Sequence, residues 1–125
     1  MNAIQSLRSG TARLISENHI TVTIHRVEYK DDGVGGRYKE EKDLPSFIGR
    51  LVPLRQQIQK RQNEAGEIRV IDWMLVALWD ANIRAGGDVE DTFIVKGKLY
   101  RIDKVIERNY KGEVYAIHIT AEEMS

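Results

Sequence analysis

The sequence predicts a mainly β protein: a small β-barrel or rolled antiparallel sheet of about six strands, with an N-terminal helix and long polar loops. Fourteen isoleucines and ten valines outnumber eight leucines and eight alanines, and β-branched side chains favour strands over helices. Short stretches in which polar and apolar residues alternate, bounded by glycine-containing turns, favour the same fold class. The 125 residues match the size of one domain, so we expect a single core.

The N-terminal segment, residues 1–17, is expected to be an amphipathic helix. Ile4, Leu7, Leu14 and Ile15 recur at helical spacing, with a weak point near Gly10. Such a helix either covers an open end of the β core or docks on a neighbouring protein. The basic face is too thin to favour binding to a membrane surface, and no apolar run is long enough to span a membrane.

Residues 19–120 are expected to form the β core. From His19 onward apolar and polar residues alternate, and the apolar face changes near His25, which indicates a β-bulge. Two aspartates and three glycines between residues 31 and 36 predict turns. Because charged residues continue to Asp43, residues 30–46 are expected to be a flexible hairpin or extended loop that leaves the core.

A second long loop is expected at residues 55–66. The preceding strand, residues 47–54, ends at Pro53, and after it only Leu54 and Ile58 could share an apolar stripe. A helix so polar would gain little by packing on its own core. We therefore expect this segment to be mobile or to be ordered by contacts outside the monomer.

The C-terminal half is expected to supply most of the sheet. Residues 68–79 are nearly all apolar, which favours a long strand buried on both faces, although periodicity leaves a buried helix open. Lys96 and Gly97 divide a hairpin between Phe93 and Ile106, a turn follows at residues 109–112, and the last strand covers residues 114–120.

The composition excludes several kinds of chemistry. The absence of cysteine excludes disulfides, thiolate zinc sites and cysteine nucleophiles, and 19 basic residues balance 19 acidic ones. Asp88, Glu90 and Asp91 could hold a hard cation in a small metal enzyme, but a solvated turn is the simpler interpretation. The three histidines are too scattered to share an ion. We expect no enzyme, no cofactor and no metal.

One charge pattern is less ordinary. Arg50, Arg55, Lys60 and Arg61 lie in a stretch, residues 49–63, that contains no acidic residue. A single copy would bind a phosphate backbone weakly. If many copies faced a common axis, the same segment would form a dense basic ring.

The segment Trp73–Asp88 followed by Phe93–Val105 carries a resemblance. Its order is an apolar strand, a Gly-Asp turn, a short strand, a Lys-Gly turn and then Tyr100-x-Ile102-x-x-Val105. This order resembles the head–tail connector proteins (stopper or head-completion proteins) of tailed bacteriophages, in particular the small connector proteins of PBSX-type defective Bacillus prophages. The likeness covers about residues 47–120.

The resemblance implies a β-barrel that self-associates into a ring between the portal or adaptor proteins and the tail-terminator protein. The ring would lie in the neck of a virion or phage-like particle, after synthesis in the host cytoplasm, and would help to retain packaged double-stranded DNA. The candidate channel-facing loop, which we favour for its basic and glutamine-rich character, contains Arg55, Gln56, Gln57, Gln59, Lys60 and Arg61. The candidate inter-subunit loop contains Lys30, Asp31, Asp32, Arg37, Tyr38 and Lys39. Which of the two loops lines the channel, the ring size and the role as stopper, adaptor or terminator are left open.

The alternative function is a single-stranded nucleic-acid-binding module on a small barrel. The basic stretch from Arg50 to Arg61 and five tyrosines motivate it. Stacking platforms need aromatic side chains gathered on one sheet face, and these tyrosines are scattered near turns.

Overall fold

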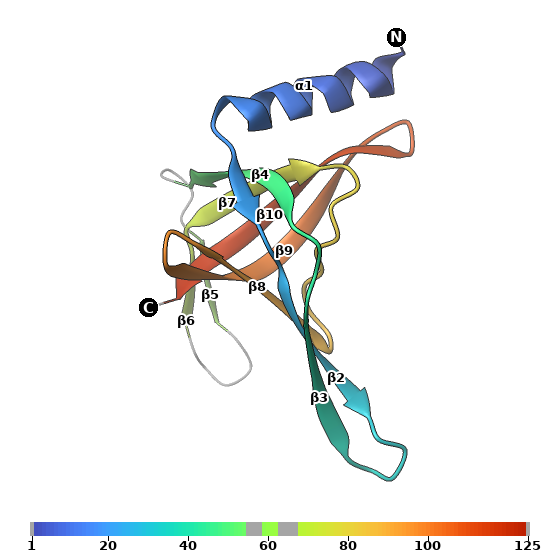
Figure 1. Cartoon of the computed structure of the whole chain (residues 1–125), viewed down its shortest axis with the longest axis vertical. Coiled ribbons are helices and arrows are strands. Elements are labelled where there is room, and N and C mark those ends of the chain that lie inside the picture. Colours follow the sequence, from blue (N-terminus) through green and yellow to red (C-terminus); the bar gives the residue numbers. More distant parts are fainter. Residues whose placement is uncertain (1, 55–58, 63–67, 125) are drawn as a thin grey trace.

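The computed structural model describes residues 2–54, 59–62 and 68–124, with only the backbone described for 59–62 and 68–70 (Figure 1). The described chain contains one helix and ten strands. In chain order they are α1 (Ala3–Glu17), β1 (Ile20–Val22), β2 (His25–Asp31), β3 (Arg37–Asp43), β4 (Phe47–Pro53), β5 (Gln59–Gln62), β6 (Ile68–Ile71), β7 (Trp73–Leu78), β8 (Val89–Val95), β9 (Lys98–Tyr110) and β10 (Glu113–Met124).

Eight strands form one antiparallel sheet in the order β1-β4-β7-β10-β9-β8-β2-β3, which curls into an open half-barrel (Figure 1). The mainly β class with one N-terminal helix is therefore confirmed. The expected number of about six strands is wrong. The alternating stretch that begins at His19 divides at Thr23 and Ile24 into two strands, and the charged stretch from Arg37 to Asp43 is a strand as well.

The core of the half-barrel consists mainly of β-branched and aromatic residues. Leu75 on β7, Ile119 on β10 and Ile24, which lies between β1 and β2, are fully buried although they are far apart in the sequence. Phe93 stacks on Tyr100 with ring centroids 5.2 Å apart. The excess of isoleucine and valine in the composition is therefore explained by a core that packs on a β-sheet.

The expected long strand over residues 68–79 is wrong, because the chain changes sheets within it. Ile68–Ile71 pairs with β5 in a separate two-stranded sheet, whereas Trp73–Leu78 lies inside the main sheet between β4 and β10. The charged residue Asp72 separates them and accepts a backbone hydrogen bond from Leu54. Trp79, expected in the core, is 43% exposed.

The predicted C-terminal hairpins are confirmed, and their strands are longer than expected. β8 and β9 turn at Lys96 and Gly97, and β9 and β10 turn at Lys111 and Gly112. Each turn has positive φ at both central residues (51° and 80°, then 51° and 83°), the geometry that matches the twist of a two-residue hairpin.

The helix covers one end of the half-barrel, as the first of the two alternatives proposed (Figure 1). Asn2 and Gln5 form a capping box at its start, and the helix continues through Gly10 without the expected weak point. Arg8 lies 3.9 Å from the centre of the Trp79 ring and donates to the carbonyl of Val114 at 2.9 Å.

Candidate functional site

A two-stranded arm projects from the half-barrel (Figure 1). We define the arm as residues 25–43: strands β2 and β3, paired from His25 with Asp43 to Asp31 with Arg37, and the turn between them. On its other side β2 pairs with β8, but only from His25 to Glu28. Since β3 pairs with β2 alone within the described chain, β3 is an edge of the sheet.

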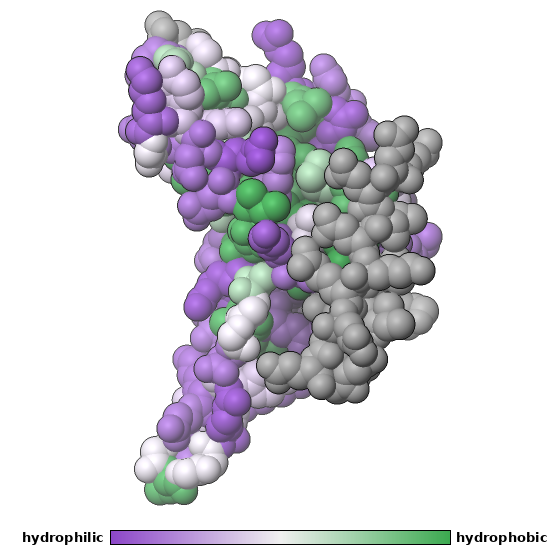
Figure 2. Space-filling model, turned by 180° about the vertical axis from the view of Figure 1, so that it is seen from behind, coloured by the Kyte–Doolittle hydropathy of each residue, from purple (hydrophilic) through white to green (hydrophobic). Residues whose placement is uncertain are grey.

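The outer part of the arm has no core of its own. No side chain from Tyr29 to Asp43 is buried, and all seven residues of β3 are exposed. Figure 2 shows this part as a hydrophilic protrusion with a hydrophobic spot at the tip, where Val34 is 88% exposed. An isolated two-stranded ribbon is at best marginally stable in water. Its order therefore depends on contacts at its base and its tip.

The tip of the arm is held by aspartate side chains. Asp31 Oδ1 accepts a hydrogen bond from the Gly33 amide at 2.8 Å, and Asp32 Oδ1 accepts from the amides of Val34 and Gly36 at 2.9 and 3.0 Å. These contacts add to the backbone hydrogen bond that the Asp32 amide donates to the Gly36 carbonyl at 3.1 Å. The turn predicted from residues 31–36 is confirmed. Of the two alternatives for residues 30–46, the structure shows the hairpin and not the extended loop, and its second strand reaches Asp43.

The base of the arm is anchored by a buried ion pair. Arg26 on β2 donates to both carboxylate oxygens of Asp91 on β8 at 2.9 Å, and to Asn82 Oδ1 at 3.1 Å. The amide of Arg84 donates to the same carboxylate at 2.7 Å. Bidentate contacts and extra donors are what a buried charge pair needs to offset its desolvation. We did not predict this pair from the sequence. The available signal was Arg26, which takes the next position in the alternation of apolar residues that ends at Ile24.

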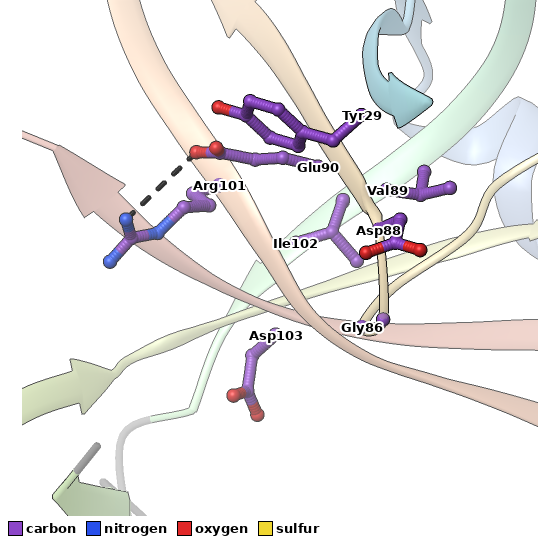
Figure 3. Close-up of a pocket in the computed structure, with 9 residues that line it drawn as sticks. Tyr29, Gly86, Asp88, Val89, Glu90, Arg101, Ile102 and Asp103 are labelled. Atoms are coloured by element: carbon purple, nitrogen blue, oxygen red, sulfur yellow. Dashed lines mark ion pairs between the residues drawn. The ribbon is translucent and has the colours of Figure 1, made fainter. Parts of the chain in front are cut away.

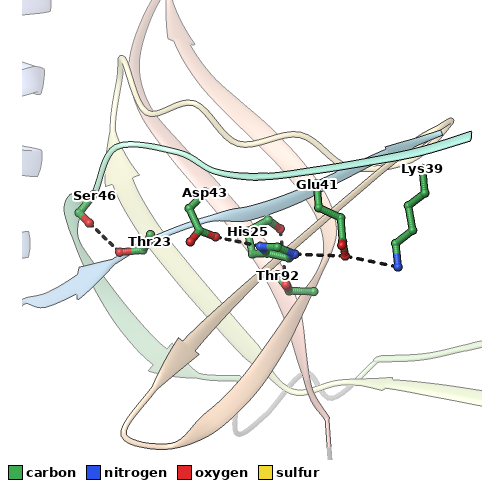
Figure 4. Close-up of polar contacts among 7 residues, drawn as sticks. All are labelled: Thr23, His25, Lys39, Glu41, Asp43, Ser46 and Thr92. Carbon is green, nitrogen blue, oxygen red and sulfur yellow. Dashed lines mark hydrogen bonds and ion pairs between the residues drawn. The ribbon is translucent and has the colours of Figure 1, made fainter. Parts of the chain in front are cut away.

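His25 links the two strands at the base (Figure 4). Its Nδ1 lies 2.8 Å from Asp43 Oδ1, its Nε2 lies 3.5 Å from Glu41 Oε1, and Lys39 pairs with Glu41 at 3.3 Å. The hydrogen bond to Asp43 is the main cause that raises the pKa of His25, burial opposes it, and Glu41 adds to it. The cluster favours a protonated histidine between two carboxylates.

All six residues assigned to the inter-subunit loop lie on the outer part of the arm. Asp31 and Asp32 hold the tip, Lys30 pairs with Glu40 across the strands, and Lys39 pairs with Glu41. The two remaining residues are Arg37, which pairs with Asp88, and Tyr38, which is half exposed. The structure brings this group together, and its inter-subunit role stays a prediction.

The acidic cluster proposed as a cation site is separated by the fold. Each carboxylate forms an ion pair with a different arginine: Asp91 with Arg26, Glu90 with Arg101 at 3.9 Å, and Asp88 with Arg37. Asp88 and Glu90 line an open pocket of about 290 Å³ at the arm base (Figure 3). In the part of the chain that the structure describes, no group of three histidine or acidic side chains is placed to hold a metal ion.

The residues assigned to the channel-facing loop are only partly described. Arg55, Gln56 and Gln57 lie outside the described residues. Strand β5, which pairs with β6, contains the other three residues, Gln59, Lys60 and Arg61. The predicted loop over residues 55–66 is therefore wrong for residues 59–62. Arg50, the remaining basic residue of the stretch, lies on β4 and donates a hydrogen bond to the carbonyl of Leu14 in the helix at 3.0 Å.

The tyrosines do not form one stacking platform. Tyr100 is buried in the core between Phe93 and Trp73. On the arm, Tyr38 pairs with Lys30, which is the neighbour of Tyr29 in the chain. Because successive residues of a strand point to opposite faces, Tyr29 and Tyr38 lie on opposite faces of the ribbon.

No protein-family model and no curated protein matches the chain. Within the described residues, no helix has the length and apolar character needed to cross a membrane.

Proposed function

We propose that this chain is a structural protein of a phage or prophage head–tail connector, which forms a ring between the portal or adaptor and the tail-terminator protein. The resemblance of residues 47–120 to such connectors motivates the proposal. A half-barrel with a helix across one end and an arm that extends beyond its own core supports it.

The arm is the single observation that carries the proposal. Fifteen consecutive residues, Tyr29–Asp43, contain no buried side chain, yet all seven residues of β3 are paired with β2, and side-chain contacts hold the tip and the base. Such an element adds little to the stability of its own core, since burial of apolar surface is the main stabilising contribution. Its exposed edge and tip suit it for contacts with other protein surfaces.

The proposed ring would also act on DNA. Lys60 and Arg61, with Arg55, would line the channel in each copy, and repetition around the ring would multiply a basic charge that is weak in one copy. In this role the chain binds packaged double-stranded DNA without base recognition and catalyses no reaction.

The proposal is tested by deleting the gene from the phage or prophage that encodes the chain and examining particles by electron microscopy. We expect DNA-filled or leaking heads without tails, and rescue by the intact gene. A variant with Arg37, Tyr38 and Lys39 changed to alanine should fail to rescue. A matched variant with alanine at three exposed positions of β9, Lys104, Glu107 and Arg108, should rescue. Heads joined normally to tails in the deletion strain would refute the proposal.

A further inference from the structure

The outer edge of β3 has a symmetrical arrangement of charge that the proposed ring does not explain. The strand reads Arg-Tyr-Lys-Glu-Glu-Lys-Asp from residue 37 to residue 43. About the central Glu40, the basic residues Arg37 and Lys39 mirror the acidic residues Asp43 and Glu41. A strand of this kind is complementary to a second copy of itself that runs in the opposite direction.

The edge is open and regular. β3 pairs with β2 in one continuous register, without a bulge or proline, and no described strand covers its other side. In an antiparallel strand, alternate residues direct their N–H and C=O groups away from the paired neighbour. Edge strands are commonly protected from pairing by charges, bulges or proline. On β3 only charges are present. Their order places opposite charges across from each other when a second copy of β3 pairs antiparallel about Glu40.

From these features we infer that two copies of the free chain pair through β3, antiparallel and with Glu40 on the twofold axis. Arg37 then lies opposite the partner's Asp43, and Lys39 lies opposite the partner's Glu41, each twice by symmetry. Opposite charges directly across two strands are stabilising, and like charges there are destabilising.

The remaining residues of β3 fit the same register. Tyr38 faces Lys42 of the second copy, a suitable neighbour for a cation. The two Glu40 side chains meet at the axis, and each already forms an ion pair with Lys30 of its own arm, which reduces their repulsion.

Neighbouring registers are less favourable. A slip of one residue in either direction places Lys42 opposite Arg37 or opposite Lys39. A slip of two residues shortens the pairing from seven residues to five. The charge order therefore selects a single alignment.

This inference concerns the free chain and does not depend on the proposed function. A pair with a twofold axis has no polarity, so it cannot be part of a ring whose two faces bind different partners. Under the proposed function, the paired form is a resting state that must dissociate before the arm contacts a neighbour in a ring. Seven residues a side are fewer than the roughly 20–30 of a standard interface, so the pair should be weak and reversible.

The test uses engineered cysteines, because the sequence contains none. Under mild oxidation the purified variant Glu40→Cys should form a disulfide-linked dimer, since residue 40 opposes itself. The matched control Lys42→Cys should not, because its two copies would lie about 14 Å apart, four strand positions of about 3.4 Å each, and a disulfide needs Cα atoms within about 7 Å.

Substitutions that exchange the charges of Arg37 and Asp43 distinguish pairing between two copies from contacts within one chain. Added to Glu40→Cys, either Arg37→Asp or Asp43→Arg should slow crosslinking at least about tenfold, and the two together should restore it. Within one chain, Arg37 contacts Asp88 and Asp43 contacts His25, so the double exchange repairs neither contact. Equal crosslinking of Glu40→Cys and Lys42→Cys, or a double variant no faster than the single ones, would overturn the inference.

Discussion

Arg26 on β2 and Asp91 on β8 are joined by two hydrogen bonds of 2.9 Å in a site where both side chains are almost fully buried. The pair lies where the arm leaves the half-barrel, and 65 positions of sequence separate its members. It therefore couples the arm to the core within the four residues, His25–Glu28, over which β2 has a partner strand on each side.

Replacing Asp91 with alanine should destabilise the protein by about 3–5 kcal/mol, because an unpaired guanidinium would remain buried. Replacing Arg26 with methionine and Asp91 with leucine together should cost less than the single change, since no buried charge remains. Chemical denaturation measures both. A loss below about 1 kcal/mol for Asp91→Ala would show that the pair is accessible to water in solution.

Trp79 and Phe93 should respond differently to truncation. Phe93 is 1% exposed and stacks on Tyr100, so Phe93→Ala should cost about 3–5 kcal/mol. Trp79 is partly exposed beneath Arg8, so Trp79→Ala should cost only about 1–2 kcal/mol and loosen the helix. Hydrogen exchange of the helix amides, together with denaturation, tests this. Equal losses for both variants would contradict the placement of Trp79.

Two glycines should respond to alanine with opposite signs. A Cβ at Gly49 would lie 2.9 Å from Leu75 Cδ1 and 3.0 Å from the Val76 carbonyl, so Gly49→Ala should destabilise the sheet by about 1–3 kcal/mol. Nothing lies within 4 Å of a Cβ at Gly10, in the helix, so Gly10→Ala should stabilise by about 0.5–1 kcal/mol. Thermal melts of the two variants give both signs, and a neutral Gly49→Ala would argue against the close approach of β4 and β7.

His25 and His118 should shift stability in opposite directions with pH. Folding raises the pKa of His25 above its usual value of about 6.5. Its contribution is therefore complete below pH about 6.5 and is lost as the pH rises through the folded-state pKa. Burial lowers the pKa of His118, so this residue instead opposes folding as the pH falls below about 6.5.

Unfolding free energies of His25→Gln and His118→Gln between about pH 5.5 and 8.5 separate the two effects. Relative to the unchanged chain, His25→Gln should lose most at the acidic end, whereas His118→Gln should gain there. A His25→Gln deficit that does not depend on pH would mean that the contacts to Asp43 and Glu41 do not favour the charged ring.

Local patterns in the sequence predicted those elements that local physics determines. Alternation predicted the strands of the C-terminal half, and Lys96-Gly97 and Lys111-Gly112 predicted the hairpin turns. Of the predicted apolar face of the helix, Ile4 and Ile15 are buried, whereas Leu14 is 44% exposed. In each case the deciding residues are neighbours along the chain or along one element.

Features that depend on distant partners were not predictable in the same way. β3 carries no apolar alternation, so its pairing with β2 is visible only in the fold. The apolar run after Ile68 gave no sign that Asp72 separates two sheets, and the acids near residue 90 gave no sign that Asp91 serves Arg26. The sequence predicted a hairpin or loop over residues 30–46, whereas the pairing from His25 with Asp43 and the anchor at Arg26 are visible only in the structure.

We propose that the arm builds a ring in the neck of a phage-like particle, and a cryo-electron microscopy reconstruction of that neck tests this proposal most directly. We expect several copies of the chain around the channel, with residues 29–43 of each copy against an adjacent protein chain. Particles whose necks lack the chain, or copies whose arms extend into solvent without a neighbour, would contradict the account.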